Sequence, residues 1–207
     1  MSASTFERAA DAIVAVGRGF DARGWAPATS GNYSARLDDG SFAVTVSGKH
    51  KGRLTPDDVM RVDGEGVSLD GKRPSAETML HLSLYRRFPE AGAVLHSHSP
   101  QAVALSRVLP GDWRIVGHEL TKAFPGIATH AGEVIIPVVD NSQDMRDIEA
   151  AIAPYLAAAA PPPAYLIRGH GLYGWGRDMA EAERVIEAAE WLAACEIAER
   201  SMRRAQA

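Results

Sequence analysis

The chain has 207 residues, of which 46% are hydrophobic and 23% charged, and its formal net charge is −4. These values are typical of a globular protein and exclude a disordered or fibrous chain, so we expect one compact domain covering residues 1–207. Lys and Arg form no dense cluster, which argues against general binding to nucleic acid or to an anionic membrane.

The N-terminus shows no pattern of an export signal. It lacks a basic region followed by an apolar core, and no stretch approaches the roughly 18 consecutive apolar residues that cross a bilayer. Cys195 is the only cysteine, which excludes an internal disulfide. These features predict a cytoplasmic protein.

The first predicted elements are a helix and a hairpin. Apolar residues recur at helical spacing over residues 5–21, and the pattern breaks at Gly24. Alternation with a period of two over residues 33–37 and 42–46, separated by Asp38-Asp-Gly40, predicts two antiparallel strands.

The next segment is expected to extend the sheet and then form a helix. Thr55 and the proline after it predict a helical turn, and strands are expected over residues 59–62 and 66–69. Ser75 is predicted to cap a helix over residues 78–87.

The middle of the chain alternates between apolar strands and helices. A short buried strand is expected over residues 91–96 and a helix over residues 100–108. Residues 119–124 are predicted to form a short helical turn, and residues 134–137 another strand.

The last third contains two helices with strands between them. The pattern over residues 144–160 predicts a helix that Pro154 kinks or divides. A strand over residues 164–167, a glycine-rich hairpin over residues 169–176 and a closing helix over residues 178–204 follow. The predicted fold is α/β in the broad sense, a central and mostly antiparallel sheet covered by helices.

Three histidines are candidate metal ligands. Side chains two positions apart in a strand share a face, so His96 and His98 can direct both imidazoles to one point while Ser97 faces away. Such a pair alone is also explained by hydrogen bonds to solvent or backbone. His170 lies between two glycines, which leave its imidazole unhindered, and it is the candidate third ligand.

Three neutral nitrogens with open positions describe a catalytic zinc site, because a structural site more often has four ligands and favours cysteine. The other histidines are interpreted differently. His50, His81 and His130 are predicted to be surface or packing residues, and His118 is placed outside the ligand set.

Two glutamates are candidates for proton transfer. Glu77 begins a helix just after Arg73, so a helix terminus and a guanidinium can fix its carboxylate. An equally good explanation is that Glu77 only complements the helix dipole. Glu119 is either the acidic start of a short helix or a general acid/base.

Two short loops combine hydroxyls, glycine and positive charge. They cover residues 29–32 and residues 47–52, the second with Lys49 as a cation. Exposed backbone N–H groups with hydroxyls and a lysine form a phosphate cradle. Each loop alone is explained by ordinary turn chemistry, but together with Ser75 and a metal they predict a phosphorylated substrate.

In order and spacing these motifs resemble the class II aldolase family over nearly the whole chain. The motifs are Gly24-Trp-Ala-Pro-Ala-Thr-Ser-Gly-Asn-Tyr-Ser34, Val46-Ser-Gly-Lys-His-Lys-Gly52, Arg73-Pro-Ser-Ala-Glu77, Val94-Leu-His-Ser-His-Ser99, Gly117-His-Glu-Leu-Thr-Lys122 and Arg168-Gly-His-Gly-Leu-Tyr-Gly-Trp-Gly176. The resemblance implies the class II aldolase-like fold and a homotetramer. It implies zinc ligands at His96, His98 and His170, and phosphate contacts at Thr29, Asn32, Ser47, Gly48 and Ser75.

The likeness is strongest to a dehydratase branch of the family, which implies loss of water from a phosphorylated ketose through a zinc-stabilised enediolate. In that branch the proton-transferring glutamate aligns with Glu119, which we favour, whereas the aldolases place theirs at Glu77. Ala76 departs from the aldolase pattern, which has a serine there. The alternatives are a sugar-phosphate aldolase or pentulose-phosphate epimerase, and a non-catalytic adducin-like binding module, against which the three histidines argue.

Overall fold

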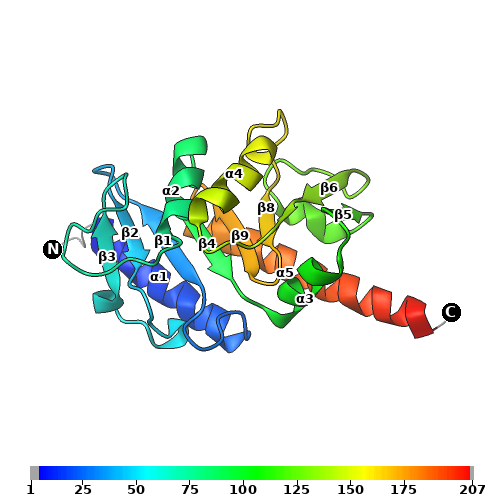
Figure 1. The fold of residues 1–207 in the computed structure, drawn as a ribbon, viewed down its shortest axis with the longest axis horizontal. Coiled ribbons are helices and arrows are strands. Elements are labelled where there is room, and N and C mark those ends of the chain that lie inside the picture. The colour runs from blue at the N-terminus through cyan, green and yellow to red at the C-terminus, as the bar shows by residue number, and fades with distance from the viewer. Residues whose placement is uncertain (1–4, 206–207) are drawn as a thin grey trace.

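A seven-stranded sheet with helices on both faces forms the centre of the protein (Figure 1). The computed structural model describes residues 5–205. The strand order is β3-β2-β1-β4-β9-β8-β7, and every neighbouring pair is antiparallel except β7 and β8. β5 and β6 form a separate antiparallel pair. The predicted fold class is therefore confirmed.

The helices are α1 (Thr5–Ala22), α2 (Thr78–Arg87), α3 (Pro100–Val108), α4 (Met145–Leu156) and α5 (Met179–Ala205), with 3-10 turns η1 (Lys51–Arg53), η2 (Pro56–Asp58) and η3 (Glu119–Ala123). The strands are β1 (Asn32–Arg36), β2 (Phe42–Thr45), β3 (Val59–Val62), β4 (Ala93–Ser97), β5 (Trp113–Val116), β6 (Glu133–Ile136), β7 (Val138–Val139), β8 (Ala164–Ile167) and β9 (Gly171–Gly176). None of these helices combines the length and the apolar composition needed to cross a membrane.

Two apolar layers hold the helices on the sheet. Leu95 of β4 belongs to the layer that packs against α1, α3 and α5, and Val94 belongs to the opposite layer, against α2 and α4. Successive side chains of a strand point to opposite faces. His96, two residues after Val94, therefore faces the side of the sheet that α2 covers.

Three predicted elements differ in the structure. The hairpin predicted over residues 169–176 is a single strand, β9, which pairs with β8 and β4. In the other two elements apolar burial is missing. Residues 66–69 add no strand but only an isolated bridge between Val62 and Ser68, and Val67 and Leu69 are exposed. The helix predicted over residues 144–160 ends at Leu156, two residues after Pro154, and the four alanines that follow are exposed. Helix propensity without a buried face does not sustain a helix.

Gly17 of α1 lets η1 pack directly on the helix. A Cβ at Gly17 would lie 2.5 Å from the carbonyl oxygen of Lys51, closer than a real side chain comes to backbone. Gly17→Ala is therefore expected to lower the free energy of unfolding by about 1–3 kcal/mol, although alanine is normally the better helix former. Urea denaturation measures this change.

Gly19 of the same helix is the matched control, because a Cβ there would meet only the ends of the flexible Arg23 and Glu183 side chains. Gly19→Ala is expected to leave stability unchanged or to raise it slightly. Equal effects of the two substitutions would contradict the packing explanation.

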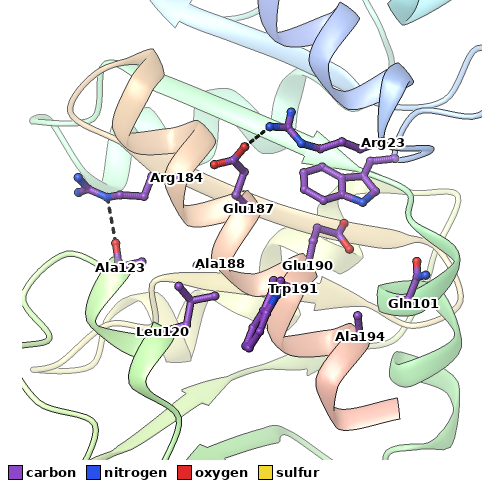
Figure 2. A pocket seen from close by; sticks show the side chains of 11 residues that line it. Arg23, Gln101, Leu120, Ala123, Arg184, Glu187, Ala188, Glu190, Trp191 and Ala194 are labelled. Carbon is purple, nitrogen blue, oxygen red and sulfur yellow. Dashed lines mark hydrogen bonds and ion pairs between the residues drawn. The ribbon is translucent and has the colours of Figure 1, made fainter. Parts of the chain in front are cut away.

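A pocket of about 560 Å³ opens between α5, η3 and the turn after α1. Leu120 and Trp191 line it together with Arg23 and Arg184 (Figure 2). Trp25 lines it as well. None of the three candidate metal ligands lines this pocket.

Glu190, which also lines that pocket, is buried and links α5 to the strand end that carries the histidines. Its carboxylate accepts hydrogen bonds from the hydroxyls of Ser97 and Ser99, the two neighbours of His98. Ser99 also caps α3 by accepting a hydrogen bond from the Ala102 amide. α5 and α3 therefore both fix the backbone around His98.

Candidate active site

His96, His98 and His170 converge at the end of β4. One ligand atom from each ring lies within 4.8 Å of the others. The ring centroids of His96 and His98 are 4.3 Å apart, and that of His170 lies 5.1 and 4.9 Å from them. The two-residue spacing brings the first pair together, and the pairing of β4 with β9 brings His170 to them.

Gly171, the first residue of β9, makes this approach possible. A Cβ there would lie 2.2 Å from the carbonyl oxygen of Ser97 and 2.7 Å from Cε1 of His96. Any side chain at this position would push His170 and β9 away from β4. The glycine after His170 is thus needed for packing as well as for an unhindered imidazole.

The hydrogen bonds of two rings leave their Nε2 atoms free to bind a metal. Nδ1 of His96 donates to the carbonyl oxygen of Leu172 at 3.0 Å, and Nδ1 of His170 donates to Oδ1 of Asn141 at 3.2 Å. Among the described residues, the buried Nε2 atoms of His96 and His98 have no hydrogen-bond partner. Buried unsatisfied nitrogens are costly, so this arrangement fits a bound ion.

The protonation of His98 also suits a ligand. Burial lowers the pKa of His98 to about 2, and the neighbouring rings of His96 and His170 add to this shift. A neutral imidazole is the form that binds zinc. The three residues therefore fit a zinc-like divalent ion, with three imidazole nitrogens as donors and no cysteine.

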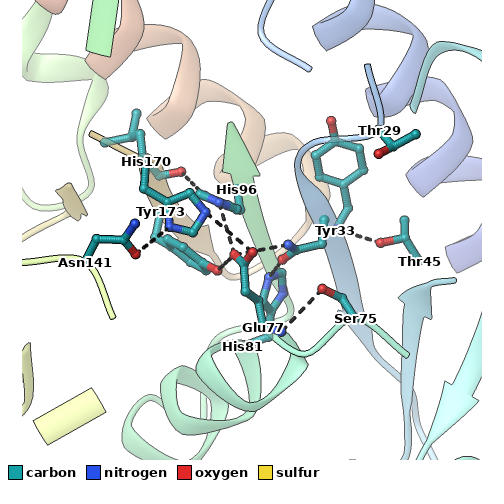
Figure 3. Close-up of polar contacts among 12 residues, drawn as sticks. Thr29, Tyr33, Thr45, Ser75, Glu77, His81, His96, Asn141, His170 and Tyr173 are labelled. Atoms are coloured by element: carbon teal, nitrogen blue, oxygen red, sulfur yellow. Dashed lines mark hydrogen bonds and ion pairs between the residues drawn. The ribbon is translucent and has the colours of Figure 1, made fainter. Parts of the chain in front are cut away.

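The Glu77 carboxylate lies beside the Nε2 atoms of His96 and His170 (Figure 3). Its Oε1 is 3.5 Å from Nε2 of His170, and its Oε2 is 3.1 Å from Nε2 of His96, without meeting the geometry of a hydrogen bond to His96. Oε2 accepts hydrogen bonds from the Tyr173 hydroxyl and, at 3.3 Å, from Nδ2 of Asn32. Two donors thus hold Oε2 in place, while Oε1 has fewer partners.

The charges around Glu77 keep it ionised. Burial alone would raise the pKa of this carboxyl, but the adjacent His96 and the contacts with His170 and Tyr173 together hold the pKa well below its usual range. Opposite charges and hydrogen bonds to the anion both favour the carboxylate. A base in its ionised form thus stands next to the candidate metal ligands.

The predicted phosphate loop of residues 47–52 lies beside the segment of residues 73–75, which carries Ser75. Val46 forms a bridge with Pro74, and the amide of Ser47 donates to the carbonyl oxygen of Arg73 at 3.0 Å. Ser47 and the following Gly48 are exposed. The predicted anion residues 47 and 48 are therefore held next to the loop that carries Ser75.

Ser75 and Asn32 both contact Glu77, so the predicted phosphate residues reach the candidate metal centre. The prediction that Ser75 caps α2 is wrong. Glu77 occupies the N-cap position without a side-chain capping bond, and its amide donates to Oγ of Ser75 at 3.3 Å. The loop of Thr29 lies just before Asn32, and its backbone is bound by Lys51.

Two predicted residues are held by other partners. Nζ of Lys49 lies 2.8 Å from Oδ1 of Asp58. The Glu119 side chain is 68% exposed and pairs with Lys122 and, at 3.1 Å, with His130. Among residues 5–205, no hydrogen bond or ion pair joins Lys49 or Glu119 to the three histidines.

The structure adds residues that the sequence did not single out. The ring of Tyr173 stacks on His96 with centroids 4.0 Å apart, and its hydroxyl binds Glu77. Asn141 orients His170. Tyr173 lies within the glycine-rich segment already noted, but only the pairing of His96 opposite Tyr173 shows that this hydroxyl belongs to the site.

Comparison with known proteins agrees with this fold. The model of the family described as Class II Aldolase and Adducin N-terminal domain matches residues 11–197. A relative from Methylococcus capsulatus, named methylthioribulose-1-phosphate dehydratase, is 52% identical over 192 residues, which cover 93% of this chain and 94% of the relative.

Solved structures show the same architecture. YgbL from Klebsiella pneumoniae has a TM-score of 0.80 at 25% identity, and the match covers 93% of this chain and 90% of the YgbL chain. The l-fuculose-1-phosphate aldolase from Thermus thermophilus has a TM-score of 0.75 at 31% identity. The match covers 94% of this chain and 95% of the aldolase chain. With a family match that spans most of the sequence, this chain belongs to the class II aldolase and adducin family.

Proposed function

We propose that this chain is a hydro-lyase that converts 5-methylthioribulose 1-phosphate to 2,3-diketo-5-methylthiopentyl 1-phosphate in methionine salvage. It uses one zinc ion per subunit and works in the cytoplasm as a homotetramer. The name of the Methylococcus capsulatus relative and its 52% identity support the choice of reaction.

The observation that carries the proposal is the convergence of three imidazoles and one carboxylate beside loops suited to an anion. His96, His98 and His170 provide nitrogen donors, and Glu77 lies within 3.5 Å of two of them. Enolisation next to a carbonyl needs an electrophile and a base in reach of one carbon, and this arrangement provides both.

A zinc ion held by the three histidines would supply a Lewis acid that makes the proton next to the ketose carbonyl more acidic. Ser47, Gly48 and Ser75 anchor the phosphate, with Thr29 and Asn32 on the adjoining loop. We assign the base to Glu77 rather than to Glu119, which the resemblance favoured, because Glu77 lies beside two of the histidines while Glu119 pairs with Lys122 and His130. Glu77 takes the proton from C3 on Oε1, since Oε2 is already held by Tyr173 and Asn32.

The C4 hydroxyl then leaves with a proton as water, and the resulting enol takes a proton at C4 while its C3 hydroxyl gives one up, which yields the diketone. This sequence removes one molecule of water and needs no oxidant. Glu119 is the proposed acid for the departing hydroxyl, supported by the family resemblance of its motif.

A substrate panel tests the proposed function. The zinc-loaded protein is given 5-methylthioribulose 1-phosphate, fuculose 1-phosphate and ribulose 5-phosphate, and products are identified by mass spectrometry. We expect loss of water from the first compound, with kcat/KM roughly 100-fold above the others. No dehydration of the first compound would refute the proposal.

A sugar-phosphate aldolase is the second candidate, favoured by the 31% identity to the Thermus thermophilus aldolase. It would release two carbonyl fragments, and an epimerase would return an isomer of its substrate. A non-catalytic adducin-like module would show neither stoichiometric metal nor turnover. Sedimentation velocity tests the tetramer separately.

A further inference from the structure

Lys51 is a buried lysine of the loop of residues 47–52, and its ammonium group lies between this loop and the loop of residues 29–32. It is 2% exposed, and its Nζ donates to the carbonyl oxygens of Thr29 at 2.9 Å and of Lys49 at 2.7 Å. The first carbonyl belongs to the loop of residues 29–32 and the second to the loop of residues 47–52. One ammonium group therefore ties the two loops together.

The packing of η1 on α1 explains why the Lys51 side chain is buried. Gly17 allows the backbone of Lys51 to lie against the helix, where any larger residue would collide with it. Lys49, two positions earlier, is instead exposed and paired with Asp58. Of the two lysines in the loop, the structure directs only Lys51 inward.

The charge of Lys51 lacks a counter-ion. Carbonyl oxygens are its only hydrogen-bond partners in the part of the chain that the structure describes, and it forms no ion pair there. Burial lowers the pKa of Lys51 to about 8, and the more distant carboxylate of Glu77 opposes this shift. A buried cation without a paired charge is unfavourable, and a bound anion would remove this cost.

We propose that Lys51 is a positioning residue of the anion pocket, which holds the loops of Thr29 and Lys49 together and supplies the buried positive charge that favours a phosphate there. This inference rests on the proposed function, because the loops are those assigned to the substrate phosphate. It assigns to Lys51 the cationic role that the sequence alone suggested for Lys49.

Steady-state kinetics with 5-methylthioribulose 1-phosphate give the first test. Lys51→Met is expected to raise KM about tenfold or more, since charge-assisted hydrogen bonds and loop positioning are lost, with a smaller change in kcat. The matched control is Lys72→Met, because Lys72 also donates to two carbonyl oxygens, those of Asp57 and Val59, and neither belongs to the two anion loops. Lys72→Met should keep KM within about twofold.

Sulfate binding gives a test that needs no turnover. Sulfate keeps the same charge between pH 7 and 9, and its affinity is measured from the shift of Tm of the metal-loaded protein at constant ionic strength. With a pKa of about 8 for Lys51, the charged fraction falls about tenfold over this range, and the apparent sulfate affinity of the wild type should fall with it. Lys51→Arg keeps its charge, so its affinity should stay nearly constant.

Other charged groups surround this lysine, and the comparison of wild type with Lys51→Arg separates its titration from theirs. They are Asp21 on α1, His50 and Lys49 in the loop, Asp58 on η2, Glu77 before α2 and His98 after β4.

An unchanged KM in Lys51→Met, or a sulfate affinity that does not depend on pH in the wild type, would overturn the proposal. If Lys51→Met does not fold, the wild type and Lys51→Arg still decide the sulfate test. Failure of the wild type to dehydrate 5-methylthioribulose 1-phosphate would refute the proposed function instead, and sulfate binding would still test Lys51.

Discussion

Replacing His96 by alanine is expected to remove the metal and the activity together. The ring contributes an Nε2 that is fully buried and has no hydrogen-bond partner among the described residues. Loss of groups that merely orient a metal ligand already weakens metal affinity by roughly 10- to 100-fold, so loss of a ligand should cost at least about 100-fold. Metal analysis of the purified variant and its kcat/KM are the two measurements.

His96 also stacks on Tyr173, so its removal leaves a cavity and lowers stability. His170→Ala provides a second variant, because its side chain is 17% exposed and its loss disturbs the core less. His118→Ala is the control for metal content, since His118 contacts Glu199 and not the cluster. Stoichiometric zinc in both His96→Ala and His170→Ala would exclude the three-histidine site.

Glu77→Gln is expected to lower kcat by about 10²- to 10⁴-fold while the metal stays bound. The amide has nearly the shape of the carboxylate but cannot accept the C3 proton. Exchange of the C3 hydrogen with deuterium from solvent, followed by NMR, should stop together with dehydration. Glu149→Gln, which removes a carboxylate paired with Arg86 at the surface, should leave both rates unchanged.

Glu119→Gln separates the two glutamates. If Glu119 only protonates the leaving hydroxyl, this variant should lose dehydration and keep C3 exchange. A Glu77→Gln variant with near-normal kcat, beside a Glu119→Gln variant that loses both exchange and dehydration, would reverse the assignment and make Glu119 the base.

Much of the secondary structure could be predicted because its signals are local. The opening helix, the hairpin of β1 and β2 and the closing helix each bury a face whose period is visible over a few residues. The strand pattern also placed His96 and His98 on one face. β5 was not predicted, although Trp113 and Ile115 alternate with exposed residues, and β7 has only two residues and depends on its partner β8.

The sequence by itself determined the fold class, the face shared by His96 and His98 and the glycines that flank His170, because these depend on residues close together in the chain. Only the tertiary structure decided that Glu77 lies among the histidines, that Tyr173 binds it, and that Lys51 rather than Lys49 is buried between the loops. These contacts join β4 to β9, α2 to the strand ends and η1 to α1. Local periodicity carries no information about such pairings, which are selected by how well the whole core packs.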